Sequence, residues 1–210
     1  MAGRFDSPFF IHPDRQMKRY LTNIVLVLLM VSAWACSSSR ESIYKSDFPL
    51  MNEYANSTNE ELSVKIPEGW LAVDENKNHS IDLWLVKEDF SATISFTPIH
   101  VDDSTYDEIK SSESENDLSL ALDYSKTFRK AVLGDKFKPV LKDEYFELDN
   151  RPFAAYQFTD SNSLPARVVV FRYGRFYYEV SANFSDKKAA GSFSSEELFR
   201  VQNSILSTLK

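Results

Sequence analysis

Cysteine is nearly absent from this sequence. Its single copy, Cys36, leaves no partner for a disulfide and no second thiolate for a metal site. Glycine is also scarce, with 5 residues in a chain of 210, which excludes a glycine-rich phosphate-binding loop and a low-complexity linker. Chemistry that depends on cysteine clusters or glycine loops is therefore not expected.

Histidine is rare as well. Of the 3 residues, His79 and His100 are those that follow Cys36, and His79 stands in a polar turn where solvation is expected. His100 with Asp102 and Asp103 offers imidazole and carboxylate groups, which suit a divalent cation. No third, remote ligand accompanies them, so the sequence predicts no metal and no cofactor.

Motifs for nucleophilic catalysis and for paired-carboxylate chemistry are weak. A Ser-His-Asp hydrolase needs a histidine fixed between nucleophile and carboxylate, and no Gly-x-Ser-x-Gly elbow occurs. Carboxylate pairs stand at Glu60-Glu61, Asp143-Glu144 and Glu196-Glu197, and adjacent side chains on a strand or helix usually point apart. We therefore predict no catalytic residues, with an enzyme of unrecognised type as the least favoured alternative.

A short hydrophobic segment near the start is the clearest signal present. Lys18 and Arg19 precede an apolar run from Ile24 to Val31, and small residues then lead to Cys36. This order is typical of an export signal, and the run is shorter than the roughly 20 residues of a membrane-spanning helix. The end, Ala33-Trp34-Ala35-Cys36, is similar to the lipobox of bacterial lipoproteins. That resemblance implies lipidation of Cys36, with ordinary secretion and an uncleaved anchor as alternatives.

The segment divides the chain into four parts. Residues 1–16 are predicted to be an extension upstream of a true start at Met17, and residues 17–36 a lipoprotein signal peptide. Residues 37–60 are predicted to form a flexible tether, and residues 61–210 one globular domain. Ser37 and Ser38 lack the aspartate that retains enterobacterial lipoproteins in the inner membrane. By that resemblance we expect the outer membrane, facing the periplasm.

The charge balance limits the partners. The net charge is −7, and without residues 1–36, which carry four basic and two acidic residues, it is near −9. Nucleic-acid-binding proteins carry basic stripes, so no nucleic acid is expected. An acidic surface is also repelled by anionic lipids, so the lipid on Cys36 should supply the membrane link.

Hydrophobic periodicity predicts an order of strands, helix, strands and helix. A helix is expected over Asp117 to Leu133, closed by Gly134, and another after the capping box Ser194-x-x-Glu197. Strands are expected around Leu62–Ile66 and over residues 80–87, 92–99, 140–148, 153–158, 167–172 and 176–184. The expected fold class is α+β, an antiparallel β-sheet flanked by helices.

The apolar residues predict how these elements pack. The first helix should bury a stripe made of Leu118, Ala121, Leu122, Ser125, Phe128, Val132 and Leu133. The last helix should bury a stripe made of Leu198, Val201, Ile205, Leu206 and Leu209. Residues 168–171 are apolar at every position, which suits a central strand covered on both faces.

Several short motifs together resemble the PsbP-like family. They are Pro67-Glu68-Gly69-Trp70 at a strand end, the turn Leu148-Asp149-Asn150-Arg151-Pro152, and the aromatic strand Arg175-Phe176-Tyr177-Tyr178 before a closing helix. The resemblance spans roughly Leu62 to Lys210. It implies a PsbP-like α/β/α sandwich, a fold also found in a yeast Ran-binding nuclear-import factor and in bacterial envelope lipoproteins. Its members mostly bind or assist other proteins, and no shared catalytic residues are carried over.

A contact patch is the one candidate site beyond Cys36. Arg172, Arg175 and Tyr177 combine arginine with an aromatic residue, the types enriched at binding hot spots. Phe176 and Tyr178 are expected to face the core, which leaves Tyr177 for the other side of the sheet. Trp70 and Trp84 are expected in the core.

The sequence thus favours a non-catalytic, membrane-anchored envelope lipoprotein that binds or helps to assemble envelope proteins. The alternative is a carrier of a small molecule or lipid, with a pocket between sheet and helix. The sequence leaves the identity of the partner and the oligomeric state open.

Overall fold

The computed structural model describes residues 44–58, 61–73, 80–100, 117–160 and 162–210. The chain divides into two units, Met1–Glu41 and Ser42–Lys210, and the fold described below is that of the second. Residue Cys36 and the predicted signal peptide lie outside the described residues. No helix in the described ranges is long and apolar enough to cross a membrane.

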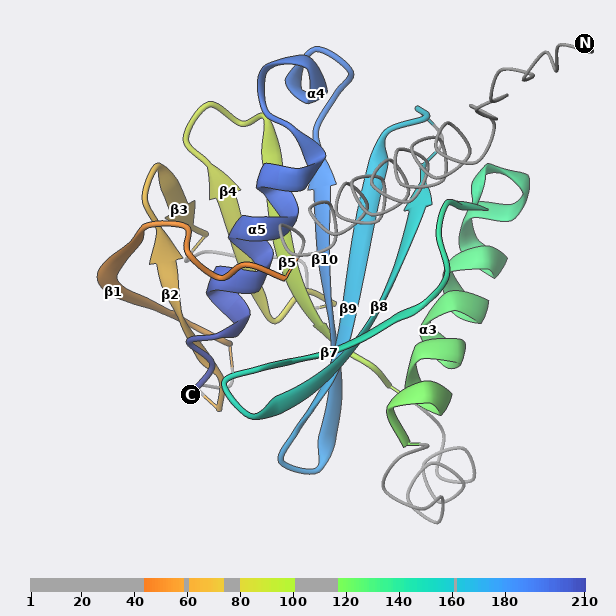
Figure 1. Ribbon diagram of the computed structural model, residues 1–210, viewed down its shortest axis with the longest axis horizontal. Coiled ribbons are helices and arrows are strands. Elements are labelled where there is room, and N and C mark those ends of the chain that lie inside the picture. The colour runs from red at the N-terminus through yellow and green to blue at the C-terminus, as the bar shows by residue number, and fades with distance from the viewer. Residues whose placement is uncertain (1–43, 59–60, 74–79, 101–116, 161) are drawn as a thin grey trace, which may run out of the picture. The chain divides into compact units, whose positions relative to one another are not determined.

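The domain is built from antiparallel strands and two long helices (Figure 1). The strands are β1 (Leu50–Asn56), β2 (Ser63–Pro67), β3 (Trp70–Ala72), β4 (Leu83–Lys87), β5 (Ala92–Pro98), β6 (Lys138–Pro139), β7 (Glu144–Leu148), β8 (Arg151–Thr159), β9 (Pro165–Tyr173) and β10 (Phe176–Phe184). The helices are α3 (Asp117–Leu133), the short α4 (Ala189–Ser192) and α5 (Ser195–Leu206), with a 3-10 turn at Gly134–Lys136. The predicted α+β class is confirmed.

An eight-stranded antiparallel sheet forms the centre of the domain. Its order is β3-β4-β5-β10-β9-β8-β6, with β7 also paired to β8, while β1 and β2 form a separate two-stranded ribbon. The helix α3 packs against β8 and β9, whereas α5 packs against β2, β9 and β10. The two helices contact different core clusters on the two faces of the sheet, so the predicted α/β/α layering is confirmed.

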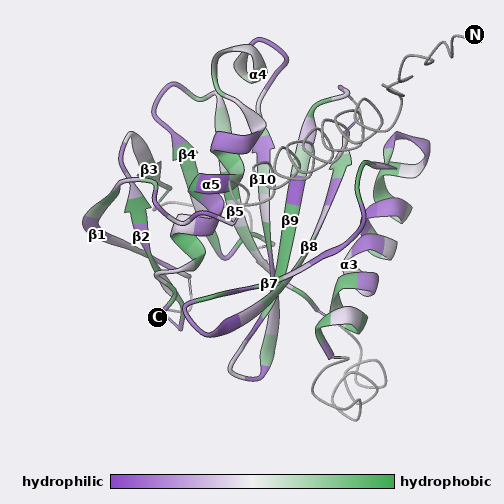
Figure 2. Ribbon diagram, viewed as in Figure 1, coloured by the Kyte–Doolittle hydropathy of each residue, from purple (hydrophilic) through white to green (hydrophobic). Residues whose placement is uncertain are grey.

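Strand β9 separates the two core clusters. Alternate side chains of a strand point to opposite faces, and Val169 and Phe171 join the cluster under α5 while Val168 and Val170 join the cluster under α3. All four are fully buried, as predicted for a strand covered on both faces, and β9 is hydrophobic over much of its length in Figure 2.

Helix α5 follows its sequence signals closely. The Ser194 hydroxyl accepts a hydrogen bond from the Glu197 backbone N–H at 3.1 Å, as a capping box requires. The whole predicted stripe is buried, and each fully buried leucine, valine or isoleucine stabilises the fold by about 1.5–3 kcal/mol.

Helix α3 has the predicted bounds but only half of the predicted buried stripe. Leu118, Ala121, Leu122 and Ser125 are buried, whereas Phe128 and Val132 are 62% and 66% exposed. The last two turns still meet the sheet through Arg129, which bonds Glu179 and Ser181 of β10, but Phe128 and Val132 lie at the open side of that contact.

Two predictions about the strands are corrected. The segment 37–60 was expected to be a tether, yet Leu50–Asn56 forms β1 and pairs with β2, so the folded domain begins before residue 61. The expected strand 140–148 is shorter: only Glu144–Leu148 form a strand, β7, and residues 140–143 connect it to the two-residue β6. In this connection the Asp143 carboxylate accepts from Lys126 Nζ of α3 at 2.9 Å.

A buried arginine lies in the core beneath α5. Arg167 of β9 is fully buried and donates to Glu144 of β7 at 3.2 Å and to Asn203 of α5 at 2.8 Å. Its guanidinium also lies over the rings of Phe146 and Phe199, with centroids 5.0 and 5.8 Å away. Burial lowers the pKa of Arg167, and the Glu144 carboxylate opposes that shift. The network joins β7, β9 and α5.

Candidate functional site

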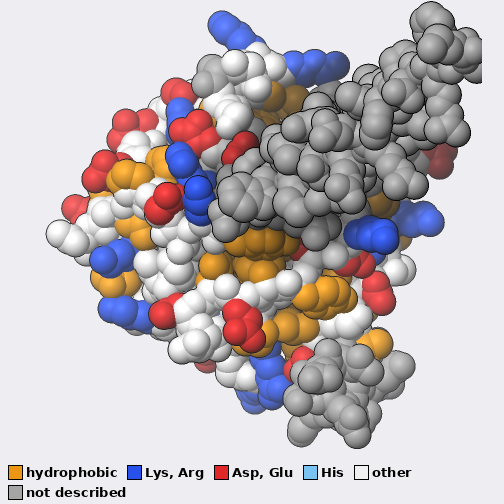
Figure 3. All heavy atoms as spheres, in the orientation of Figure 1, with side chains coloured by type: hydrophobic (Ala, Val, Ile, Leu, Met, Phe, Trp, Pro, Cys, Tyr) orange, Lys and Arg blue, Asp and Glu red, His pale blue; other side chains and the backbone are white. Residues whose placement is uncertain are grey.

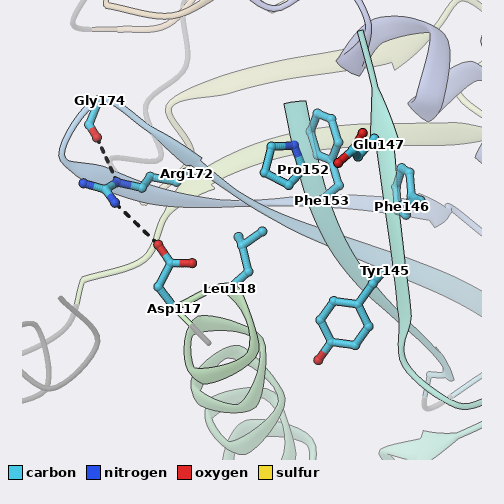
Figure 4. A pocket seen from close by; sticks show the side chains of 9 residues that line it. All are labelled: Asp117, Leu118, Tyr145, Phe146, Glu147, Pro152, Phe153, Arg172 and Gly174. Atoms are coloured by element: carbon cyan, nitrogen blue, oxygen red, sulfur yellow. Dashed lines mark hydrogen bonds and ion pairs between the residues drawn. The ribbon is translucent and has the colours of Figure 1, made fainter. Parts of the chain in front are cut away.

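A hollow with a volume of about 730 Å³ lies where α3 begins. We call it the α3–β7 hollow; it is lined by Asp117, Leu118, Tyr145, Phe146, Glu147, Pro152, Phe153, Arg172 and Gly174 (Figure 4). Its residues come from α3, from the β7–β8 hairpin and from the turn between β9 and β10.

One wall of the hollow is polar, and its side chains hydrogen-bond to Asp117, the first residue of α3. Its Oδ2 accepts hydrogen bonds from the Tyr177 hydroxyl at 3.0 Å and from Arg172 Nη1 at 3.4 Å. Arg172 Nε also donates to the Gly174 carbonyl at 3.2 Å. Gly174 has φ of +59°, a conformation that glycine adopts without the penalty of a side chain. The tight turn thereby fixes the guanidinium at the mouth of the hollow.

The opposite wall is aromatic and comes from β7. Tyr145 is 57% exposed, and its hydroxyl donates to Ser119 Oγ of α3 at 3.2 Å. Phe146 points to the other face of the sheet, where its ring stacks on Phe153 with centroids 5.5 Å apart. Figure 4 shows Tyr145 and Arg172 on opposite sides of the hollow. Figure 3 shows hydrophobic side chains gathered in the middle of one face, with charged ones around them.

The predicted contact residues are only partly brought together. Arg172 is exposed and lines the hollow. Tyr177 does face the other side of the sheet from Tyr178, as predicted, but it is only 4% exposed under α3, so it is not a surface contact. Arg175 is exposed, lies over the Phe176 ring at 4.8 Å from its centroid, and is not among the residues of the hollow.

Sequence reasoning missed Tyr145 and Asp117. In Glu144–Leu148 the alternation of strand side chains places Phe146 and Leu148 toward one face and Tyr145 and Glu147 toward the other, a signal that was available. The contacts of Asp117 with Arg172 and Tyr177 could not be predicted, because an acidic residue at a helix start is ordinarily explained by its favourable interaction with the helix dipole.

A second hollow, the α3–β5 groove, lies between sheet and helix. It has a volume of about 430 Å³ and includes the exposed Phe128 and Val132; it is lined by Ser80, Thr97, Pro98, Ile99, His100, Tyr124, Ser125, Phe128, Arg129, Val132, Leu133 and Glu179. Most of its walls are therefore apolar, while a few polar groups converge at its base.

The polar groups at the base of the groove bond to one another. Ser125 Oγ donates to Glu179 Oε2 at 2.6 Å and lies 2.9 Å from the Tyr156 hydroxyl. Arg129 donates to the Glu179 carboxylate and to Ser181 Oγ at 3.0 Å. Burial raises the pKa of Tyr156. Since Ser125 bonds the carboxylate directly, these groups do not have the Ser-His-Asp order of a hydrolase.

The remaining candidates are separated in space or lie outside the described residues. His100 is exposed, but Asp102, Asp103 and His79 are not described. Asp143 turns to Lys126 while Glu144 turns to Arg167, so this pair points apart as predicted. Within the described ranges no group of three or more His, Cys, Asp or Glu residues could hold a metal ion.

Both tryptophans lie in strands. Trp70 is 1% exposed and belongs to the core cluster under α5, as predicted. Trp84 was also expected in the core, but it is half-buried and contributes to a small surface hollow beside β1 and β3, so this prediction is wrong.

Comparisons with known proteins assign no family to the chain. No protein-family model matches it, and no curated protein matches its sequence. Among solved structures, cyanobacterial PsbP (CyanoP) from Synechocystis shares 12% identity at a TM-score of 0.46, over 75% of this chain and 91% of that one. LpqN of Mycobacterium tuberculosis, described as involved in cell envelope biogenesis, shares 11% identity at a TM-score of 0.42, over 71% of this chain and 82% of that one. At these values the comparisons carry no functional assignment.

Proposed function

We propose that this chain is a lipid-anchored, non-catalytic protein of the bacterial cell envelope that binds envelope proteins through the α3–β7 hollow. The observation that carries the proposal is the pairing of an exposed tyrosine with an exposed arginine across an open hollow. Tyrosine and arginine are enriched among the residues that dominate binding energy, and central hot spots lie in pockets that a partner can desolvate. Tyr145 and Arg172 stand in such an arrangement.

The electrostatics of the hollow fit protein recognition. Asp117 accepts hydrogen bonds from Tyr177 and Arg172, so the guanidinium is held in place beside its acidic partner, and Glu147 also lines the hollow. A partner that presents a backbone carbonyl to the guanidinium, next to an apolar side chain, would complement it. The α3–β5 groove and the hollow beside β1 and β3 are smaller, about 430 and 310 Å³.

Cross-linking in cells tests the proposal. A photoreactive amino acid replaces Tyr145 in the full-length protein carrying a tag after Lys210, and the captured proteins are identified by mass spectrometry. The control is the same replacement at Leu71 of β3, which is 50% exposed at the opposite edge of the sheet. We expect a reproducible envelope protein from position 145 and not from position 71. Identical captures from both positions would contradict the proposal.

The lipid anchor has its own test. Cys36→Ala should release the protein from the membrane fraction, because the thioether-linked chains would be lost. Density separation of inner and outer membranes tests the proposed outer-membrane location. Retention of Cys36→Ala in the membrane would count against lipidation.

A second candidate function is carriage of a small molecule or lipid in the α3–β5 groove. The observation that favours it is the exposure of Phe128 and Val132 beside a groove with a polar base. A carrier predicts a ligand that co-purifies with the protein and is detected by native mass spectrometry. Val132→Glu should remove that ligand without unfolding, because Val132 is 66% exposed.

A further inference from the structure

Strand β7 is an edge strand, and it pairs with β8 on one side. The two strands are joined by a two-residue turn, Asp149–Asn150, in which both residues have positive φ, +51° and +61°. Such a turn makes Leu148 and Arg151 a pair that exchanges both backbone hydrogen bonds. Along an antiparallel ladder, bonded pairs alternate with pairs whose backbone groups point away from each other.

This alternation decides which backbone groups of β7 point to the open side. Counting back from Leu148, every second residue bonds to β8, so the N–H and C=O groups of Tyr145 and Glu147 point outward. The bond from the Val140 N–H to the Gln157 carbonyl, at 3.0 Å, follows the same alternation farther along β8. Within the described ranges, no other backbone group bonds to the outward groups of Tyr145 and Glu147.

Several other strand edges of the domain are short, interrupted or covered. Strands β3 and β6 have three and two residues, and β6 ends in Pro139. The register of β1 is interrupted between Leu50 and Tyr54, and the far side of β2 is covered where the Ser63 N–H donates to the Lys210 carbonyl at 2.9 Å. These features prevent unwanted strand pairing, whereas β7 has a continuous register over its five residues and no proline.

The α3–β7 hollow adjoins this open edge. The pairing of β8 with β9 ends at Ala154 and Val170, although both strands continue past this point. Pro152, the next residue of β8 that faces β9, would stand opposite Arg172 and has no N–H to donate. The ladder ends there, and the hollow lies between the β7–β8 and β9–β10 hairpins. The two outward-facing residues of β7 also line it.

Deepening the proposed function and resting on it, we propose that the envelope partner contributes an extended segment that pairs with β7 as an added strand. Extended peptides bind open sheet edges through main-chain hydrogen bonds, and their alternate side chains supply specificity. The pairings described in this sheet are antiparallel, and antiparallel ladders are slightly the more stable, so the segment runs antiparallel to β7. Every second side chain of the segment then lies on the face of the hollow, beside Tyr145 and Glu147.

The side chains of the edge select those of the segment. Glu147 is exposed and forms no ion pair with a described residue, so a lysine or arginine opposite it is favoured. Arg172 is already paired with Asp117. The Tyr145 ring, 57% exposed, favours an apolar side chain opposite it. In an antiparallel segment the basic residue comes first, so the expected order is basic, any residue, apolar.

A proline at the edge tests strand addition. The photoreactive amino acid at position 145 of the full-length protein is combined with Glu147→Pro or with Glu147→Ala. Proline removes the outward N–H and places its ring in the path of the added strand, while the bonds to β8 are kept. We expect Glu147→Pro to lower capture of the partner at least about tenfold, and Glu147→Ala to lower it about threefold or less. Equal capture from the two variants would overturn strand addition.

The same experiment separates the two levels of the proposal. Capture from position 145 no greater than from the Leu71 control would refute the proposed function itself, whereas equal capture from the proline and alanine variants refutes only the added strand. Mass spectrometry of the linked peptide identifies the occupant. A linked segment of this chain, from the same copy or from a second copy, would overturn a separate partner.

Charge reversal tests the pairing without a change in the backbone. Glu147→Lys should lower capture at least about threefold, and replacing the basic residue of the linked partner segment with glutamate should restore it. A linked segment without the order basic, any residue, apolar would overturn the inference, as would a double change that restores nothing. This comparison decides the matter if protease resistance in cell extracts shows that Glu147→Pro does not fold.

Discussion

Arg167 is the residue on which the packing of β7, β9 and α5 most depends. A buried charge is tolerated only when it is paired and hydrogen-bonded, and Glu144, Gln202 and Asn203 accept from its guanidinium. Gln157 donates to the other oxygen of Glu144 at 2.8 Å and completes the pairing of that carboxylate.

Arg167→Met should destabilise the domain by about 3–5 kcal/mol, because it leaves a largely buried Glu144 carboxylate without its cation. Urea denaturation measures the loss. Arg175→Met, at an exposed arginine, should change the free energy of unfolding by less than about 0.5 kcal/mol. Adding Glu144→Gln to Arg167→Met should recover part of the loss; a double variant no more stable than the single one would contradict the pairing.

Asp89, in the turn between β4 and β5, should make stability depend on pH. Hydrogen bonds from Lys87 and then from Ser91 lower its pKa from 3.8 to about 2. A lowered folded-state pKa stabilises the fold above pH 3.8, and this contribution is lost as the pH falls toward 2. Because the side chain is 52% exposed, the contribution should be only about 0.2–1 kcal/mol. Urea midpoints of wild type and Asp89→Asn should differ at pH 7 and converge near pH 2; a constant difference would contradict the assignment.

At the scale of elements, the apolar stripe and cap in the sequence predict the packing of α5 better than that of α3. The cap and the whole apolar stripe of α5 behave as the sequence indicates. In α3 the same kind of stripe is divided between buried and exposed residues: Leu118, Ala121, Leu122 and Ser125 are buried, whereas Phe128 and Val132 are exposed.

Ser194→Ala should cost about 1 kcal/mol of unfolding free energy, because the Glu197 N–H loses its acceptor at the start of α5. Thermal or urea unfolding measures it. Ser194→Asp provides the control, since aspartate also accepts at this position and should keep the stability. An alanine variant as stable as wild type would mean that the cap adds nothing.

In α3, Leu122→Ala should cost about 2–5 kcal/mol, because Leu122 is fully buried. Phe128→Ala, six residues along the same helix, should change the free energy of unfolding by less than about 0.5 kcal/mol because the ring is 62% exposed. Equal losses from the two variants, measured by urea denaturation, would show that Phe128 is covered in solution.

At the scale of the whole molecule, residues 44–49 and β1 belong to the folded domain. A protein that starts at Glu61 loses the partner strand of β2 and the contacts of Phe48 with α5. We expect a chain of residues 61–210 to melt well below one of residues 42–210, or to aggregate, as measured by calorimetry. Equal melting temperatures would show that residues 42–60 add no stability.

The sequence alone was sufficient for features with a local cause. Alternation of apolar and polar residues placed β2, the continuous apolar run 168–171 identified the central strand β9, and Ser194-x-x-Glu197 located the start of α5. Each depends on residues that are neighbours along the chain. The α+β class follows from the order of these elements.

Tertiary structure alone decided the features that depend on distant residues. The way α3 packs on the sheet left Phe128 exposed. The pairing with β2 made residues 50–56 a strand, and Asp117 accepts from the hydroxyl of Tyr177, which had been expected at the surface. The α3–β7 hollow likewise brings together Tyr145 of β7 and Arg172 of β9, which have the whole of β8 between them in the chain. Such contacts are set by the packing of whole elements, which no pattern within one element encodes.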